Sequence, residues 1–234
     1  ILLYKLALPQ ADLVLFLNND DAKDLLDKYH IKVKRREVLG GIGLDLKEYR
    51  FSEFSSSFIS FVFIARLLRE KGIFEFLKAA EKLKKKYPEV IFKVIGSFDI
   101  ENPGALKKEE LQYYIDNNII TYPGFVNNIN QWITESSVFV LPSYREGVPR
   151  STQEAMAIGR AIITTDVPGC RETVENGENG FLIPKWDISA LVKAMEYFIK
   201  NPTEIKRMGF KSYQMALEKF DGNKVNKKLL KLIE

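Results

Sequence analysis

Two glutamates, Glu146 and Glu154, flank a glycine- and proline-containing turn with seven residues between them. Small residues typical of a packed helix follow the second glutamate. Pro149 suits the first position of that helix, because this position needs no backbone donor. The free N–H groups at such a helix start bind anions, with the helix dipole behind them. Carboxylates accept hydrogen bonds from hydroxyl groups, so the pair suits a sugar on one side and a ribose on the other.

Two cations, Arg66 and Lys71, follow an apolar run at 58–65. Two positive side chains at the end of a strand can neutralise a diphosphate. Gly72 then allows a helix to start close to them. Taken alone, each cation is more typical of a solvated surface than of a site. The sequence therefore predicts a phosphate site only if the fold brings these cations to the glutamate pair.

Apolar strands and helical patterns alternate from residue 58 to the end of the chain, which predicts an α/β fold. The expected strands centre on Phe61, Val94, Ile120, Phe139, Ile163 and Leu182. The expected helices span 72–87, 106–118, 128–135, 150–159, 169–176, 187–200, 203–219 and 223–234. This alternation indicates a Rossmann-like parallel sheet with helices on both faces. Ligands of such sheets bind beyond the carboxyl ends of the strands, where the charged residues above are expected.

The first 50 residues have a different pattern. A short strand at 11–18 ends in a polar cluster that can cap a helix through Tyr29, and a second short strand follows at 36–39. The polar stretch at 50–57 is the predicted domain boundary. The chain therefore divides into three predicted parts, 1–50, 51–220 and 221–234.

Composition excludes several classes of site. One histidine, His30, and one cysteine, Cys170, rule out a disulfide framework and a two-histidine zinc site. We interpret His30 as a surface residue and Cys170 as a packing residue, although a helix start can also lower a thiol pKa. With 234 residues and 46% apolar content, the chain can form a core without a metal or disulfide.

The net charge of +4 comes with lysine-rich amphipathic stretches, which we interpret as solvated helix faces. Attraction to an anionic lipid surface is the alternative, and nucleic-acid binding lacks a motif. The longest apolar run is far shorter than the about 20 residues that span a bilayer. Because the chain starts at Ile1 without a methionine, we expect it to be part of a longer protein.

The segment from Glu146 to Glu154, continued by small residues up to Gly159, resembles the E-x7-E element of glycosyltransferase family 4. This family comprises retaining GT-B glycosyltransferases of the glycosyl transferases group 1. Residues 65–72 resemble its Gly-Arg…Lys-Gly diphosphate clamp, with Ala65 replacing the first glycine. Further similar segments are 11–21, 43–45, 168–172 and 179–182. The resemblance implies a C-terminal donor-binding domain, preceded by a stub of the N-terminal acceptor-side domain and the interdomain linker. It also implies that the last helix, 221–234, packs back towards the N-terminal domain.

The resemblance also implies a role for each matching residue. Arg66 and Lys71 would hold the diphosphate of the donor, Glu146 would bind the transferred sugar, and Glu154 would bind the ribose. The other residues expected to contact the donor are Gly147, Val148, Arg150, Ser151, Thr152, Phe125 and Val126. Arg160 stands where the family commonly has a small or apolar residue, and we expect it on the surface.

By this resemblance, the protein transfers a hexose or N-acetylhexosamine with retention, without a cofactor or metal ion. We expect a UDP-sugar as donor and a saccharide or isoprenoid-lipid-linked acceptor, in bacterial cell-surface glycan synthesis such as that of lipopolysaccharide. The implied location is the cytoplasm, with peripheral association of the full-length protein at the inner face of the cytoplasmic membrane left open.

Two alternatives have different sequence requirements. A UDP-sugar 2-epimerase on the same scaffold would need a site rich in histidine, which a chain with one histidine lacks. A non-catalytic nucleotide-sugar-binding module would keep the same four charged residues without turnover. Because most of the N-terminal domain would be missing, we expect this chain alone to bind donor and to be inactive as a transferase.

Overall fold

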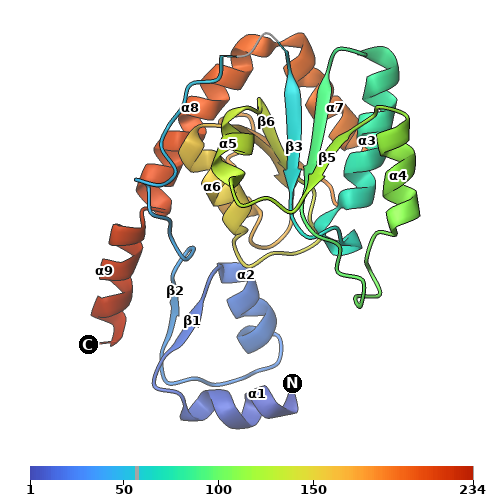
Figure 1. The fold of residues 1–234 in the computed structure, drawn as a ribbon. Helices are drawn as coiled ribbons and strands as arrows, with labels where there is room; N and C mark the ends of the chain where they lie inside the picture. The colour runs from blue at the N-terminus through green and yellow to red at the C-terminus, as the bar shows by residue number, and fades with distance from the viewer. Residues whose placement is uncertain (56–57, 234) are drawn as a thin grey trace.

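The computed structural model describes residues 1–55 and 58–233, and a parallel sheet with helices on both faces forms most of it (Figure 1). The strand order in this sheet is β5-β4-β3-β6-β7-β8, and all neighbours run parallel. The strands are β3 (Ser60–Ile64), β4 (Ile91–Ile95), β5 (Thr121–Gly124), β6 (Val138–Leu141), β7 (Ala161–Thr165) and β8 (Gly180–Ile183). The predicted fold class is confirmed.

Helices bury both faces of the sheet. They are α3 (Ile73–Lys86), α4 (Lys108–Asp116), α5 (Ile129–Thr134), α6 (Arg150–Ile158), α7 (Ile188–Lys200) and α8 (Pro202–Lys219). α3 packs beside α7 and α6 beside α8, and Figure 1 shows the two pairs on opposite sides of the sheet. Every residue of β3, β6 and β7 is buried, as expected for central parallel strands covered on both faces.

The strand order places the topological switch point between β3 and β6. From β3 the chain builds outwards through β4 and β5, and it then returns to β6 and builds the other way through β7 and β8. The loops after β3 and β6 therefore diverge and leave a crevice at the carboxyl ends of these strands. This crevice is where the predicted site residues are expected to meet.

The N-terminal part has its own small core. A parallel pair, β1 (Val14–Phe16) and β2 (Arg36–Val38), packs with α2 (Asn19–Ala22), and α1 (Leu2–Ala7) precedes it. Asn18 caps α2 by accepting a hydrogen bond from the backbone N–H of Asp21. The buried apolar residues here are Phe16, Ala22, Leu26 and Ile31, separate from the core around the large sheet.

The segment that joins the two parts belongs to the larger core, because Leu44, Tyr49 and Phe54 are buried there. The last helix, α9 (Gly222–Ile233), lies beside β2 (Figure 1), and Lys228 donates a hydrogen bond to the carbonyl of Val38. The domain limits at residues 50 and 220 stay predictions. Of the predicted hinge at 50–57, residues 56 and 57 lie outside the described residues, as does the last residue of the predicted helix 223–234.

Two sequence predictions are wrong in detail. The expected helix at 169–176 is only a 3-10 turn, Arg171–Thr173, because Val174 is extended and the Asn179 side chain bonds the backbone of Thr173 and Glu175 instead. β5 begins after its predicted centre, since the N–H of Ile120 bonds to the end of α4 rather than to a strand.

The expected surface position of Arg160 is also wrong. Its side chain is fully buried, and the guanidinium donates to backbone carbonyls of Thr134, Ser136, Ile158 and Ser52. Burial lowers the pKa of Arg160 to about 10.

Within residues 1–55 and 58–233, no helix has both the length and the apolar composition needed to cross a membrane.

Candidate active site

The loop after β3 carries both predicted cations to the crevice. Arg66 forms an ion pair with Asp99, with 2.8 Å between Nη1 and Oδ2, and its side chain is 57% exposed. Lys71 closes a 3-10 turn, and Gly72 follows with φ +76°. A Cβ at Gly72 would lie 2.2 Å from the carbonyl oxygen of Pro142, so only glycine lets this loop contact the loop after β6.

Lys71 reaches the first glutamate across that contact. Its Nζ lies 2.6 Å from Oε1 of Glu146, and the hydroxyl of Ser143 donates to the same oxygen at 2.7 Å. The side chains of Lys71 and Glu146 are 21% and 11% exposed, so the pair is mostly shielded from solvent. Within the described part of the chain, Oε2 of Glu146 accepts no hydrogen bond and is left for a ligand.

The start of α6 has the free backbone donors that Pro149 led us to expect, and anion binding there stays a prediction. Pro149 is the N-cap residue, and no side chain caps the helix. The first backbone bond into the helix runs from Gln153 N–H to the carbonyl of Pro149. The amides of Arg150, Ser151 and Thr152 therefore have no backbone acceptor among the described residues. These three donors and the helix dipole favour a phosphate at this point.

Glu154 lies one turn into α6, with its side chain only 8% exposed. Its Oε1 accepts a hydrogen bond from Nε of Arg150 and another from the hydroxyl of Tyr49, both at 2.9 Å. Its Oε2 accepts none from the described residues. The two glutamates thus share one pattern, in which protein donors hold Oε1 and leave Oε2 for a ligand.

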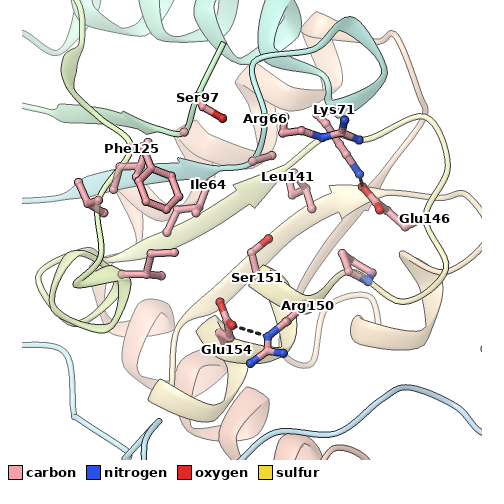
Figure 2. A pocket seen from close by; sticks show the side chains of 16 residues that line it. Ile64, Arg66, Lys71, Ser97, Phe125, Leu141, Glu146, Arg150, Ser151 and Glu154 are labelled. Atoms are coloured by element: carbon pink, nitrogen blue, oxygen red, sulfur yellow. Dashed lines mark hydrogen bonds and ion pairs between the residues drawn. The ribbon is translucent and has the colours of Figure 1, made fainter. Parts of the chain in front are cut away.

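These groups line one cavity of about 450 Å³ at the switch point. Figure 2 shows Lys71 and Glu146 at one end, Phe125 at the other, and Glu154 with Arg150 beneath Ser151. Of the predicted site residues, the cavity is lined by Arg66, Lys71, Phe125, Val126, Glu146, Arg150, Ser151 and Glu154. This size matches pockets that enclose small organic ligands.

Gly147, Val148 and Thr152 do not line the cavity. Val148 and Thr152 are buried, and Gly147 faces Leu17, while its carbonyl accepts a hydrogen bond from the Asn18 side chain. The backbone amide of Thr152 stays free at the start of α6, and contacts of the Gly147 and Val148 backbone with a ligand stay predictions.

Part of the cavity lining was not predicted from the sequence. Gly96 and Ser97 line the cavity directly after β4, and the rule that ligands sit beyond strand ends could have found them. Tyr49 and Asp99 gave no signal, because their partners Glu154 and Arg66 lie far away in the chain.

Cys170 is a packing residue, as interpreted from the sequence. It is fully buried, and burial raises the pKa of its thiol to about 11.

No group of three or more metal-binding side chains comes together within residues 1–55 and 58–233. The absence of a metal from the reaction stays a prediction.

A parallel sheet with cations, carboxylates and a free helix start at its switch point is the arrangement in which doubly wound α/β domains bind their ligands. Residues 47–215 match the family described as glycosyl transferases group 1. The chain belongs to this family.

Similar proteins agree with this membership. The chain is 29% identical to the N,N'-diacetylbacillosaminyl-diphospho-undecaprenol alpha-1,3-N-acetylgalactosaminyltransferase of Campylobacter jejuni, over 99% of this chain and 62% of that protein. It is 28% identical to the UDP-Gal:alpha-D-GlcNAc-diphosphoundecaprenol alpha-1,3-galactosyltransferase of Escherichia coli, over 76% and 49%. The chain thus spans less than two thirds of either relative.

A solved structure of Anabaena HepE in complex with UDP and glucose shares the fold. The TM-score is 0.83 at 20% identity, over 99% of this chain and 65% of that one. The predicted likeness to half of a GT-B glycosyltransferase is confirmed at the level of fold.

Proposed function

We propose that the cavity binds a nucleotide-diphosphate sugar, with UDP carrying a hexose or N-acetylhexosamine, and that the chain is the donor half of a retaining glycosyltransferase. One observation carries this proposal: both cations, both glutamates and the free start of α6 line a single cavity, although β4, β5 and β6 lie between Arg66 and Glu154 in the chain. Each group matches one chemical part of such a donor.

The diphosphate fits between Lys71 and the amides at the start of α6, where a cation and a helix dipole both favour negative charge. Arg66 also contacts the diphosphate once its ion pair with Asp99 is broken. Oε2 of Glu154 is left for the ribose, and Oε2 of Glu146 for the hydroxyls of the sugar. The base then falls at the end of the cavity lined by Phe125.

In the proposed reaction, the bond between the sugar and the diphosphate breaks while an acceptor hydroxyl attacks from the same face. The departing phosphate oxygen takes the proton of that hydroxyl. Lys71, Arg66 and the start of α6 stabilise the charge that develops on the diphosphate. This assignment gives positive side chains and backbone amides the task that a metal ion performs in other enzymes.

The proposed acceptor is a saccharide or an isoprenoid-diphosphate-linked saccharide of bacterial cell-surface glycan synthesis. Two of the similar proteins are named for acceptors of the diphospho-undecaprenol kind. A lipid-linked acceptor would place the full-length protein in the cytoplasm at the inner face of the membrane. Because the chain spans 62% of its Campylobacter relative, we expect it to bind donor alone without transferring sugar. Transfer well above background hydrolysis would contradict that expectation.

Calorimetric titration of the chain with UDP, GDP and ADP tests the donor site. We expect selective binding of UDP, weakened at least about 10-fold in Glu154→Ala, because a hydrogen bond to a charged group is lost. Glu218→Ala is the matched control, since Glu218 is exposed and does not line the cavity. Folded protein that binds none of the three nucleotides would refute the proposal.

A further inference from the structure

The segment between the two parts of the chain is fastened along α6 at two points. Its Ser52 donates a backbone hydrogen bond to the carbonyl of Ile158, at the end of the helix. One turn earlier on the helix, Tyr49 donates to Oε1 of Glu154. The segment thus follows the helix from its site end to its far end.

Tyr49 is well placed to hold Glu154 still. It is 7% exposed and packed in the main core, so its ring has a fixed position. The second donor to the same oxygen, Arg150, is 58% exposed in its side chain and is free to exchange with water. A packed, buried side chain has lost the rotamer freedom that an exposed arginine keeps, so it holds its hydrogen-bond partner in a more fixed position. Tyr49 therefore contributes more of the constraint on the carboxylate.

Tyr49 also remains a donor over the physiological range. Burial raises the pKa of Tyr49 above its ordinary value of 10.0, and the negative charge of Glu154 raises it further. The hydroxyl keeps its proton, and Oε1 stays occupied by Tyr49 and Arg150. The remaining oxygen, Oε2, belongs to a residue that lines the cavity.

We propose that Tyr49 is a positioning residue that orients the Glu154 carboxylate towards the ribose hydroxyls of the donor. This role rests on the donor site proposed above. Tyr49 does not line the cavity, so it acts through Glu154 and not on the ligand. Its contribution to binding is therefore confined to nucleotides that carry ribose hydroxyls.

The test compares UDP with 2′,3′-dideoxy-UDP, which lacks both hydroxyls, in calorimetric titrations of wild type and Tyr49→Phe. Phenylalanine keeps the buried ring and removes only the hydroxyl. We expect about 10-fold weaker binding of UDP and unchanged binding of the dideoxy nucleotide. In the Glu154→Ala background, Tyr49→Phe has no further effect. Circular dichroism confirms that each variant is folded.

Tyr87→Phe is the matched control, because the Tyr87 hydroxyl donates to Glu196 at 2.8 Å and neither residue lines the cavity. It leaves both affinities unchanged. Equal weakening of both nucleotides by Tyr49→Phe, or no weakening of either, would overturn the role of Tyr49 while the donor site stands. Wild-type protein that binds no nucleotide would instead overturn the donor site itself, and wild-type protein that binds both nucleotides equally well would overturn the assignment of Glu154 to the ribose.

Discussion

Replacing Arg160 with methionine tests the most deeply buried charge in the described structure. Arg160 donates to four carbonyls, including those of Ser136 at 2.9 Å and Ile158 at 3.3 Å. It ties the ends of α5 and α6 to the segment that carries Tyr49. Methionine replaces the apolar stem of the arginine but ends at about the position of Nε, so it leaves these carbonyls without their donor.

The structure sets the size of the effect. A hydrogen bond from a charged group contributes about 1.5–3 kcal/mol, so four give an upper bound of about 6–12 kcal/mol. Burial of the cation opposes this by several kcal/mol, and methionine is free of that cost. We expect a net loss of about 3 kcal/mol in the free energy of unfolding, which lowers Tm by about 6–12 °C in a chain of this size.

Thermal and urea unfolding measure this loss. Arg50→Met is the matched control, because Arg50 is exposed and donates to one carbonyl, that of Lys47. We expect that control to change stability by less than about 0.5 kcal/mol. Arg160→Lys keeps the charge but not the planar fork, and it should also be destabilised. An Arg160→Met protein as stable as wild type would refute the claim that these hydrogen bonds outweigh the burial of charge.

Three further predictions concern the two cations of the site and the buried thiol. Lys71→Met should weaken UDP binding about 10-fold or more and leave uridine binding unchanged, because only the diphosphate contact is lost; equal losses in calorimetry would contradict this. Asp99→Asn should tighten UDP binding about 2-fold, since an exposed pair that restrains Arg66 contributes about 0.5 kcal/mol; unchanged affinity would argue against a role of Arg66 at the diphosphate. The Cys170 thiol should resist a disulfide reagent at pH 8 until the protein unfolds. Burial raises the pKa of this thiol to about 11 from 9.0, so the folded state favours the protonated thiol. The protonated thiol therefore adds to the free energy of unfolding below pH 9, and this contribution is lost as the pH rises towards 11.

The sequence predicted the sheet well because its signals are local. The apolar runs of β3 and β6 and the Pro149 helix start each depend on a few neighbouring residues. The charged site residues followed from the rule that ligands sit beyond strand ends, and they gather there.

The errors concern contacts that sequence patterns do not encode. Arg160 was expected on the surface, yet three of its acceptors come from two distant segments, at 134–136 and at Ser52, that only the tertiary fold brings together. The bond between Tyr49 and Glu154 joins residues 105 positions apart. The expected helix at 169–176 failed because side-chain bonds from Asn179 compete with helical ones.

A crystal structure of the chain with UDP tests the central claim most directly. We expect a diphosphate within hydrogen-bond distance of the amides at the start of α6 and of Lys71, with a ribose hydroxyl on Oε2 of Glu154. UDP bound elsewhere, or bound in the cavity without contact to the start of α6, would contradict it.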